Sequence, residues 1–182
     1  MPVLAKDFQD LLATPSLPDL GPGPRPGAKS VAEVNKSFDG ILSAKRHPVA
    51  NEQLIRALLL LWHDHLDAAH TLAQEIEGSD GAFVHGIMHR REPDFGNAAY
   101  WFRRVGKHQA FPEIAARAGS LDALKANSKI HSALLPSSGW DAFAFIHLCE
   151  QYLRSSDTAR GLLQQIQAIE TEGLLDYLSR SN

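Results

Sequence analysis

The sequence predicts an all-α protein, a helical bundle of about seven to nine helices, and three observations lead to this prediction. Apolar residues recur at helical spacing along most of the chain. No stretch alternates with the two-residue period of a half-buried strand, and β-branched residues are sparse. The 182 residues, 44% of them hydrophobic and 21% charged, can bury a core and have the balance of an ordinary globular domain.

Residues 1–28 are expected to form a short helix followed by a Pro/Gly-rich strap. The apolar residues of this helix are Val3, Leu4, Phe8, Leu11 and Leu12. Five prolines then fall between residues 15 and 26, and because proline fixes φ and lacks an amide donor, no helix continues through them. Leu17 and Leu20 would let the strap lie on the domain, and a free linker is the alternative.

Residues 29–182 are expected to form a single helical domain. Ser30 and Glu33 have the order of a capping box, which begins a helix, and Arg46-His47-Pro48 should break the chain again. The segment Asn51–Trp62 is the most apolar helix and is expected to be central to the core. Further helices are predicted at His65–Ile76, Gly81–Arg91, Asn97–Val105, Pro112–Ala118, Trp140–Leu153 and Thr158–Leu178.

Composition and charge restrict the classes of function. A formal net charge of -3 argues against a general nucleic-acid binder, which needs a basic excess. The longest apolar run, Ala57–Trp62, is far shorter than the ~20 residues that cross a bilayer. The N-terminus lacks the order of a signal peptide, and the single cysteine, Cys149, permits no intramolecular disulfide. We therefore expect a cytoplasmic protein with no nucleic-acid partner and no membrane partner.

Two short segments of the chain are alike at an offset of thirty residues, Leu66–Leu72 and Gly96–Phe102. Asp67 aligns with Asn97, both of them residue types that favour helix starts, and the Ala-Ala pairs that follow coincide. Small residues let helices approach closely, as they do in helical repeat proteins. The sequence therefore predicts an echoed pair of helical hairpins.

Residues 82–105 read AFVHGIMHRREPDFGNAAYWFRRV, with Gly86 in the first half and the pattern Ala98-x-x-Trp101-Phe102-x-Arg104 in the second. This order resembles a tetratricopeptide-type helical hairpin of the Sel-like variety, although Arg90–Asp94 replaces the usual Gly-rich loop. The phrase HGIMHRREPDFGNAAYWFRRVG is also similar to a family of bacterial and fungal proteins without an assigned activity. Both resemblances imply a helical-hairpin fold and leave the function open.

Histidine is concentrated in the same region, where six of the nine histidines fall between residues 63 and 108. The candidate metal ligands are His85, His89 and Glu92 on one predicted helix and His63, Asp67 and His70 on the preceding one. On a helix, the first three would lie within a sector of about 60°. Two such faces packed together would form a bundle-type site for a divalent metal. The alternative is that these histidines cap helices or hydrogen-bond across the hairpins.

Arginines form a second group of candidates. Arg90-Arg91 and Arg103-Arg104 flank the predicted hairpin from opposite sides. Guanidinium groups bind carboxylates and phosphates, so unpaired members of this group would hold a small anion. The alternative, which we favour, is an internal salt-bridge network with Glu92 and Asp94 that fastens the hairpin.

Aromatic residues form a third group. Tyr100, Trp101 and Phe102 are consecutive, so a helix must spread them over much of its circumference and turn at least one toward a groove or the surface. Trp62 and Trp140 are candidates to line the same space, because a ligand pocket commonly mixes aromatic and polar side chains. The predicted ligand-binding residues are Trp62, His85, His89, Arg91, Tyr100, Trp101 and Arg104.

These candidate residues are compatible with two functions. One is a ligand- or protein-binding module whose His/Arg/aromatic face, within residues 62–108, takes a small anionic ligand or a peptide. The other is a metal-dependent hydrolase in which His85, His89 and a carboxylate hold the ion and His63 or His70 completes the shell or acts as base. The amphipathic C-terminal helix either closes the core or forms a homodimer face. We favour the binding module because the repeat accounts for more of the residues.

Overall fold

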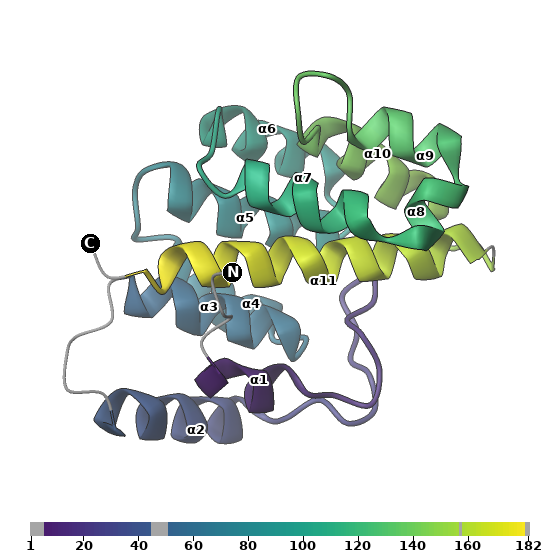
Figure 1. Ribbon diagram of the computed structural model, residues 1–182. Coiled ribbons are helices and arrows are strands. Elements are labelled where there is room, and N and C mark those ends of the chain that lie inside the picture. Colours follow the sequence, from purple (N-terminus) through teal and green to yellow (C-terminus); the bar gives the residue numbers. More distant parts are fainter. Residues whose placement is uncertain (1–5, 45–50, 157, 181–182) are drawn as a thin grey trace.

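A computed structural model describes residues 6–44, 51–156 and 158–180, and within these ranges it contains eleven helices and no strand (Figure 1). The predicted all-α bundle is confirmed. The helices are α1 (Lys6–Leu12), α2 (Val31–Ala44), α3 (Glu52–Trp62), α4 (Leu66–Ala73), α5 (Ser79–Arg91), α6 (Phe95–Val105), α7 (Phe111–Ser120), α8 (Asp122–Ala126), α9 (Ser128–Leu134), α10 (Ala142–Tyr152) and α11 (Thr158–Leu178).

The difference from the predicted set is the pair of short helices α8 and α9, which fill the gap between the predicted helices at Pro112–Ala118 and Trp140–Leu153. Asn127 separates them and caps α9 by accepting a hydrogen bond from the backbone of Ile130 at 3.1 Å. The predicted first-helix residues Val3 and Leu4, and the predicted break at 46–48, lie outside the described residues.

The longest helix, α11, organises the bundle. It runs across the middle of the molecule, with α1 and α2 on one side and α8, α9 and α10 on the other (Figure 1). It packs against α3, α7 and α10. Across the described part of the chain, no helix combines the length and the apolar content that a membrane span requires.

The most enclosed helix is α5, in which every residue from Gly81 to Arg91 is buried. The apolar helix α3 is also part of the core, as expected, whereas α5 was harder to recognise because its second half carries His and Arg side chains. Gly86 permits the enclosure: a Cβ atom there would meet the Phe102 ring of α6 at 2.5 Å. The small residue therefore sets how closely α5 and α6 pack.

The hairpins α3–α4 and α5–α6 share the same turn. The backbone N–H of His65 donates to the carbonyl of Leu60 at 2.9 Å, and the N–H of Asp94 donates to the carbonyl of His89 at 2.9 Å. Each bond spans five residues, the longer of the two bonds in a Schellman-type helix end. The two hairpins therefore share one turn geometry, with equivalent residues 29 positions apart rather than the thirty expected from the sequence.

This offset also aligns the alanines at the helix contacts. Ala69 of α4 and Ala98 of α6 are both fully buried, and each is the fourth residue of its helix. The sequence comparison used an offset of thirty because it paired Asp67 with Asn97 as helix starts. The helices in fact begin earlier and at unlike residue types, Leu66 and Phe95, which sequence similarity does not align.

The backbone N–H of Ser30 donates to Glu33 Oε2 at 2.8 Å, which confirms the capping box at the start of α2.

The N-terminal strap lies on the domain. Leu20 is fully buried, whereas Leu17 remains 38% exposed. Asp19 links the strap to α11 through an ion pair with Arg160 at 2.5 Å.

Candidate ligand-binding site

Two of the four candidate arginines, Arg90 and Arg91, are part of the core. Arg91 donates to Asp64 Oδ1 at 2.6 Å and to the carbonyl of Gly21 at 3.0 Å. Arg90 pairs with Glu170 of α11 and stacks over the Phe145 ring at 4.3 Å. The expected internal salt-bridge network is present.

Its partners differ from the predicted ones. Arg90 and Arg91 find their carboxylates on other elements of the bundle rather than at Glu92 and Asp94, because both guanidinium groups point inward from the enclosed helix α5. Burial lowers the pKa of Arg91, and the hydrogen bond and charge of Asp64 oppose that shift. The Arg91 guanidinium is therefore occupied by the protein itself.

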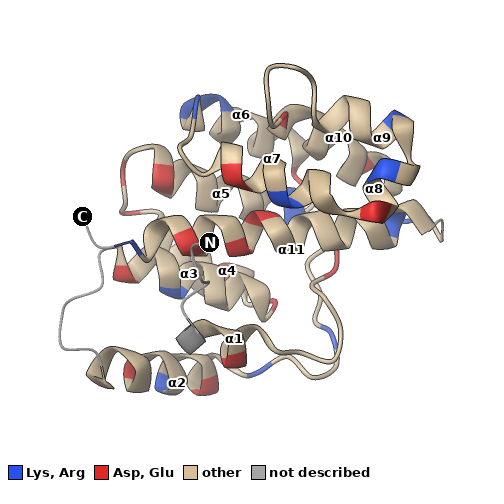
Figure 2. Ribbon diagram, in the orientation of Figure 1, with Lys and Arg blue, Asp and Glu red and all other residues tan. Residues whose placement is uncertain are grey.

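The outer face of α6 carries the remaining arginine and aromatic candidates. The Arg104 guanidinium lies over the ring of Trp101 at 5.5 Å and that of Tyr100 at 5.9 Å. Tyr100 is 46% exposed, so it is the aromatic residue that reaches the surface. Acidic and basic side chains are interspersed over most helices, and Lys and Arg gather at the end of α6 (Figure 2).

Three of the predicted histidines come together between α4 and α5. The ring centroid of His70 lies 5.4 Å from that of His85 and 5.9 Å from that of His89. The His85 ring also stacks on Trp101 of α6, with centroids 4.1 Å apart. The sequence therefore predicted correctly that these faces of the two hairpins meet.

Hydrogen bonds within the protein engage two of these rings, those of His85 and His89. His85 Nδ1–H donates a hydrogen bond to the carbonyl of Gly81, with the two atoms 3.0 Å apart. His89 Nδ1 lies 2.9 Å from Glu92 Oε2, and Asn97 Nδ2 lies 3.2 Å from His89 Nε2. Burial lowers the pKa of His85, and the neighbouring imidazoles lower it further, against the hydrogen bond to Gly81. The lowered pKa favours the neutral form of His85.

The six predicted metal ligands do not converge. His63 lies apart from the others: its Nδ1 accepts from the backbone N–H of Lys29 at 3.1 Å, and its Nε2 lies 2.8 Å from the carbonyl of Leu11. Asp67 is exposed in the first turn of α4. Within residues 6–44, 51–156 and 158–180, no three His, Cys, Asp or Glu side chains are grouped as a metal ion would need.

Cys149 is also unsuited to chemistry. It is fully buried in α10, and burial raises the pKa of its thiol to about 12, with the charge of Arg90 opposing the shift. Because the thiolate is the nucleophilic form, this cysteine is inert at neutral pH.

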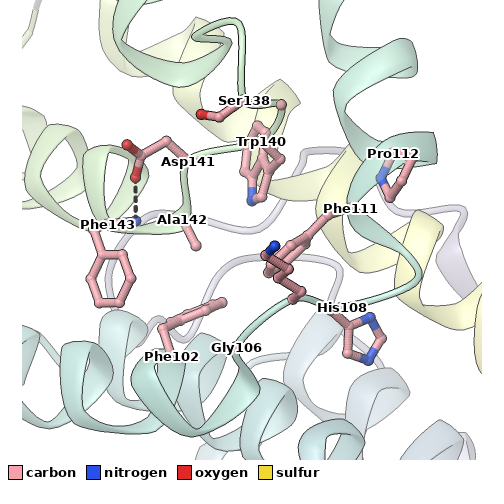
Figure 3. Close-up of a pocket in the computed structure, with 12 residues that line it drawn as sticks. Phe102, Gly106, His108, Phe111, Pro112, Ser138, Trp140, Asp141, Ala142 and Phe143 are labelled. Carbon is pink, nitrogen blue, oxygen red and sulfur yellow. Dashed lines mark hydrogen bonds between the residues drawn. The ribbon is translucent and has the colours of Figure 1, made fainter.

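A cavity of about 550 Å³ lies beside the region that the sequence singled out (Figure 3). One wall comes from the end of α6 and the start of α7, and the other from the turn before α10. The lining residues are Phe102, Gly106, Lys107, His108, Phe111 and Pro112 on the first wall and Ser138, Gly139, Trp140, Asp141, Ala142 and Phe143 on the second. Its size falls within the range of small-molecule sites, about 300–1,000 Å³.

The Trp140 indole is the notable polar group of this cavity. The side chain is only 8% exposed, and its Nε1 has no hydrogen-bond partner among the described residues. Its ring packs edge-on against Phe145, with centroids 5.4 Å apart. The nitrogen end points toward the space between Ala142, Phe111 and Phe102 (Figure 3). An unsatisfied buried donor costs about 1–3 kcal/mol, so an acceptor in the cavity would be stabilising.

Trp62 provides a useful contrast. Its Nε1 is likewise buried without a partner among the described residues, but the space beside it measures only about 10 Å³. That is room for one water molecule at most. Trp62 and Trp140 line two separate cavities, so the expectation that they share one space is wrong.

Two of the ionisable residues around the larger cavity, Asp141 and His108, are already hydrogen-bonded to other groups of the protein. Asp141 Oδ1 caps α10 by accepting from the backbone N–H groups of Phe143 at 3.0 Å and Ala144 at 2.9 Å. His108 bonds Asp80 through Nε2 at 2.8 Å and accepts from Ala110 through Nδ1 at 3.0 Å, so neither ring nitrogen is left to act as a base.

Lys107 is the exception among these charges. It is exposed at the cavity, and no described carboxylate pairs with it.

Half of this site was within reach of sequence reasoning. Phe102 to His108 lie inside the predicted functional segment and Trp140 was a predicted pocket residue, whereas the other lining residues of the second wall were not among the candidates. The available signal was a tryptophan next to a helix-capping aspartate, Trp140-Asp141, which is a weak one. No protein-family model, curated protein or solved structure matches this chain.

Proposed function

We propose that this protein is a binding module for a small, largely apolar molecule, which it holds in the cavity between the α6–α7 connection and the start of α10. The observation that carries the proposal is the buried, unpartnered Nε1–H of Trp140, which points into a cavity large enough for such a ligand. Apolar walls with a few directed polar groups are the usual composition of a ligand site.

The walls support the same assignment. Phe102 and Phe111 are held in place by T-shaped contacts with Phe83, with centroids 5.3 Å and 5.4 Å apart. Phe143 is 47% exposed at the cavity, so apolar surface is left uncovered there. A rigid aromatic wall facing an exposed aromatic edge favours a flat or branched apolar ligand, because such a body excludes water from both.

The proposal includes a cytoplasmic setting and a tetratricopeptide-like scaffold. The single, buried Cys149 is in keeping with a reducing compartment. The repeated turn of the α3–α4 and α5–α6 hairpins supports the scaffold assignment. In this view the hairpins supply the rigid wall from Phe102 to His108, and the connection before α10 supplies the second wall.

The test is a fragment screen by nuclear magnetic resonance on the ¹⁵N-labelled protein. Aromatic fragments of neutral, anionic and cationic type are added, and the indole N–H signal of Trp140 is followed, after assignment with the variant Trp140→Phe. We expect saturable shifts of this signal and of the Ala142 and Phe143 amides with at least one fragment.

A cavity-filling variant provides the control. Ala142→Leu places extra side-chain volume at a buried lining position, and Ala123→Leu makes the same change on the exposed surface of α8. Binding should be lost in the first variant and kept in the second. The proposal is wrong if no fragment at millimolar concentration shifts the Trp140 signal, or if Ala142→Leu binds as well as the unaltered protein.

A further inference from the structure

The hydrogen-bonding capacity of Trp140 limits what the cavity can take. An indole N–H donates and does not accept, so a ligand that satisfies it must present an acceptor atom. The surrounding side chains Phe102, Phe111 and Ala142 offer the rest of the ligand only apolar contact. The ligand therefore combines an apolar body with at least one acceptor directed at Nε1.

The charges at the cavity decide which acceptor suits it best. Lys107 brings an ammonium group that no described carboxylate neutralises. The negative charge of Asp141 serves the N-terminus of α10, where two backbone N–H groups and the helix dipole compensate it. His108 is already paired with Asp80. The uncompensated charge that a ligand meets is thus positive.

From these two observations, and resting on the proposed function, we infer that the ligand is an apolar monocarboxylate. Its carboxylate accepts from Trp140 Nε1–H and pairs with the Lys107 ammonium, while its hydrocarbon body lies against Phe102 and Phe111. The described lining contains one lysine and no arginine. A phosphate group carries more charge and is usually held by several donors or by bidentate arginines, so a carboxylate is the better match.

Three probes with one skeleton test this inference: 3-phenylpropionate, 3-phenylpropanamide and 3-phenylpropylamine. Their affinities are measured by titrating the Trp140 indole N–H signal. The carboxylate should bind about tenfold more tightly than the amide, because a hydrogen bond to a charged group is worth roughly twice one to a neutral group. The amine should bind most weakly, because it meets Lys107 with like charge.

Matched lysine variants separate the charge from the cavity. Lys107→Met should lower the affinity for 3-phenylpropionate about tenfold and leave that for the amide unchanged. Lys129→Met, on the exposed surface of α9, should change neither. If the amide or the amine binds as well as the carboxylate, or if Lys107→Met keeps the preference, the carboxylate inference fails while the binding module stands. If none of the three shifts the Trp140 signal, the carboxylate inference fails, and the wider fragment screen decides the proposed function.

Discussion

Arg91 and Asp64 form a buried ion pair that joins the two hairpins, with Nη2 and Oδ1 2.6 Å apart and side chains only 2% and 1% exposed. The same carboxylate accepts from Arg25 of the strap, through the guanidinium at 2.5 Å and through the backbone N–H at 2.9 Å. Arg25 is anchored further by the carbonyl of Trp62 at 2.5 Å. One aspartate therefore fastens the strap and both hairpins together.

The first prediction concerns this carboxylate. Asp64→Asn keeps a residue type that tolerates its left-handed backbone, at φ 67, and removes the negative charge that two arginines share. We expect a loss of about 3 kcal/mol in the free energy of unfolding, measured by urea titration, because a buried guanidinium is left uncompensated. Limited proteolysis should also cut the strap, residues 15–27, faster.

The matched control is the surface pair Arg56–Asp39, whose carboxylate side chain is 60% exposed. Asp39→Asn should cost less than about 1 kcal/mol, because water replaces the lost partner. Equal costs for the two variants would show that the Asp64 cluster does not hold the strap to the core.

The second prediction concerns Gly86 at the contact of α5 with α6. A Cβ atom at this position would lie 2.5 Å from the Phe102 ring, which is itself packed against Phe83. Gly86→Ala should therefore lower the free energy of unfolding by about 2 kcal/mol, the usual cost of overpacking a core. The change would be measured by urea or thermal unfolding.

Gly40 in α2 serves as the control because a Cβ atom there would have no neighbour within 4 Å. Gly40→Ala should raise stability by about 0.5–1 kcal/mol through its better helix propensity. A stabilising effect at both positions would contradict the close packing of α5 and α6.

The third prediction concerns pH. Burial is the main cause that lowers the pKa of His85 from its ordinary value of 6.5. The unfolded chain then binds a proton that the folded protein does not, so stability is full above about pH 6.5 and falls as the pH drops below it. His85→Phe keeps an aromatic ring on Trp101 and should flatten this loss between pH 7 and pH 5.

The measurement is the urea midpoint at several pH values for the unaltered protein and the variant. His63, whose pKa is also lowered mainly by burial, retains its own contribution, so some pH dependence persists in His85→Phe. His147→Gln, at a side chain that is 77% exposed, should leave the curve unchanged. A variant curve parallel to that of the unaltered protein would refute a role for His85.

The fold was largely readable from the sequence because helix signals are local. The capping pair Ser30–Glu33 and the apolar periodicity of α3 and α11 depend on residues a few positions apart. The pairing of buried charges was not readable, because it depends on distant parts of the chain. Arg90 meets Glu170 eighty residues away, and nothing in the sequence around either residue indicates the other.

The candidate site, like the fold, has local features that the sequence predicts and long-range features that it does not. The meeting of His70 with His85 followed from the hairpin pattern, because both lie on neighbouring helices at helical spacing. The cavity did not follow from it, since Lys107 and Trp140 lie 33 positions apart, with the short helices α8 and α9 between them. Only the packing of the α9–α10 turn against the end of α6 places them around one space.

The position of α11 has a consequence for the order in which the protein can fold. This helix supplies Glu170 to Arg90, and its Arg160 and Gln167 hold the strap through Asp19. A ribosome synthesises α11 after every other described helix, so until that moment Arg90 of the nascent chain lacks its carboxylate partner and Asp19 lacks its partners in α11. The α3–α4 and α5–α6 hairpins can form early and can already hold Arg25 of the strap through Asp64, whereas the contacts of Asp19 form only once α11 is present.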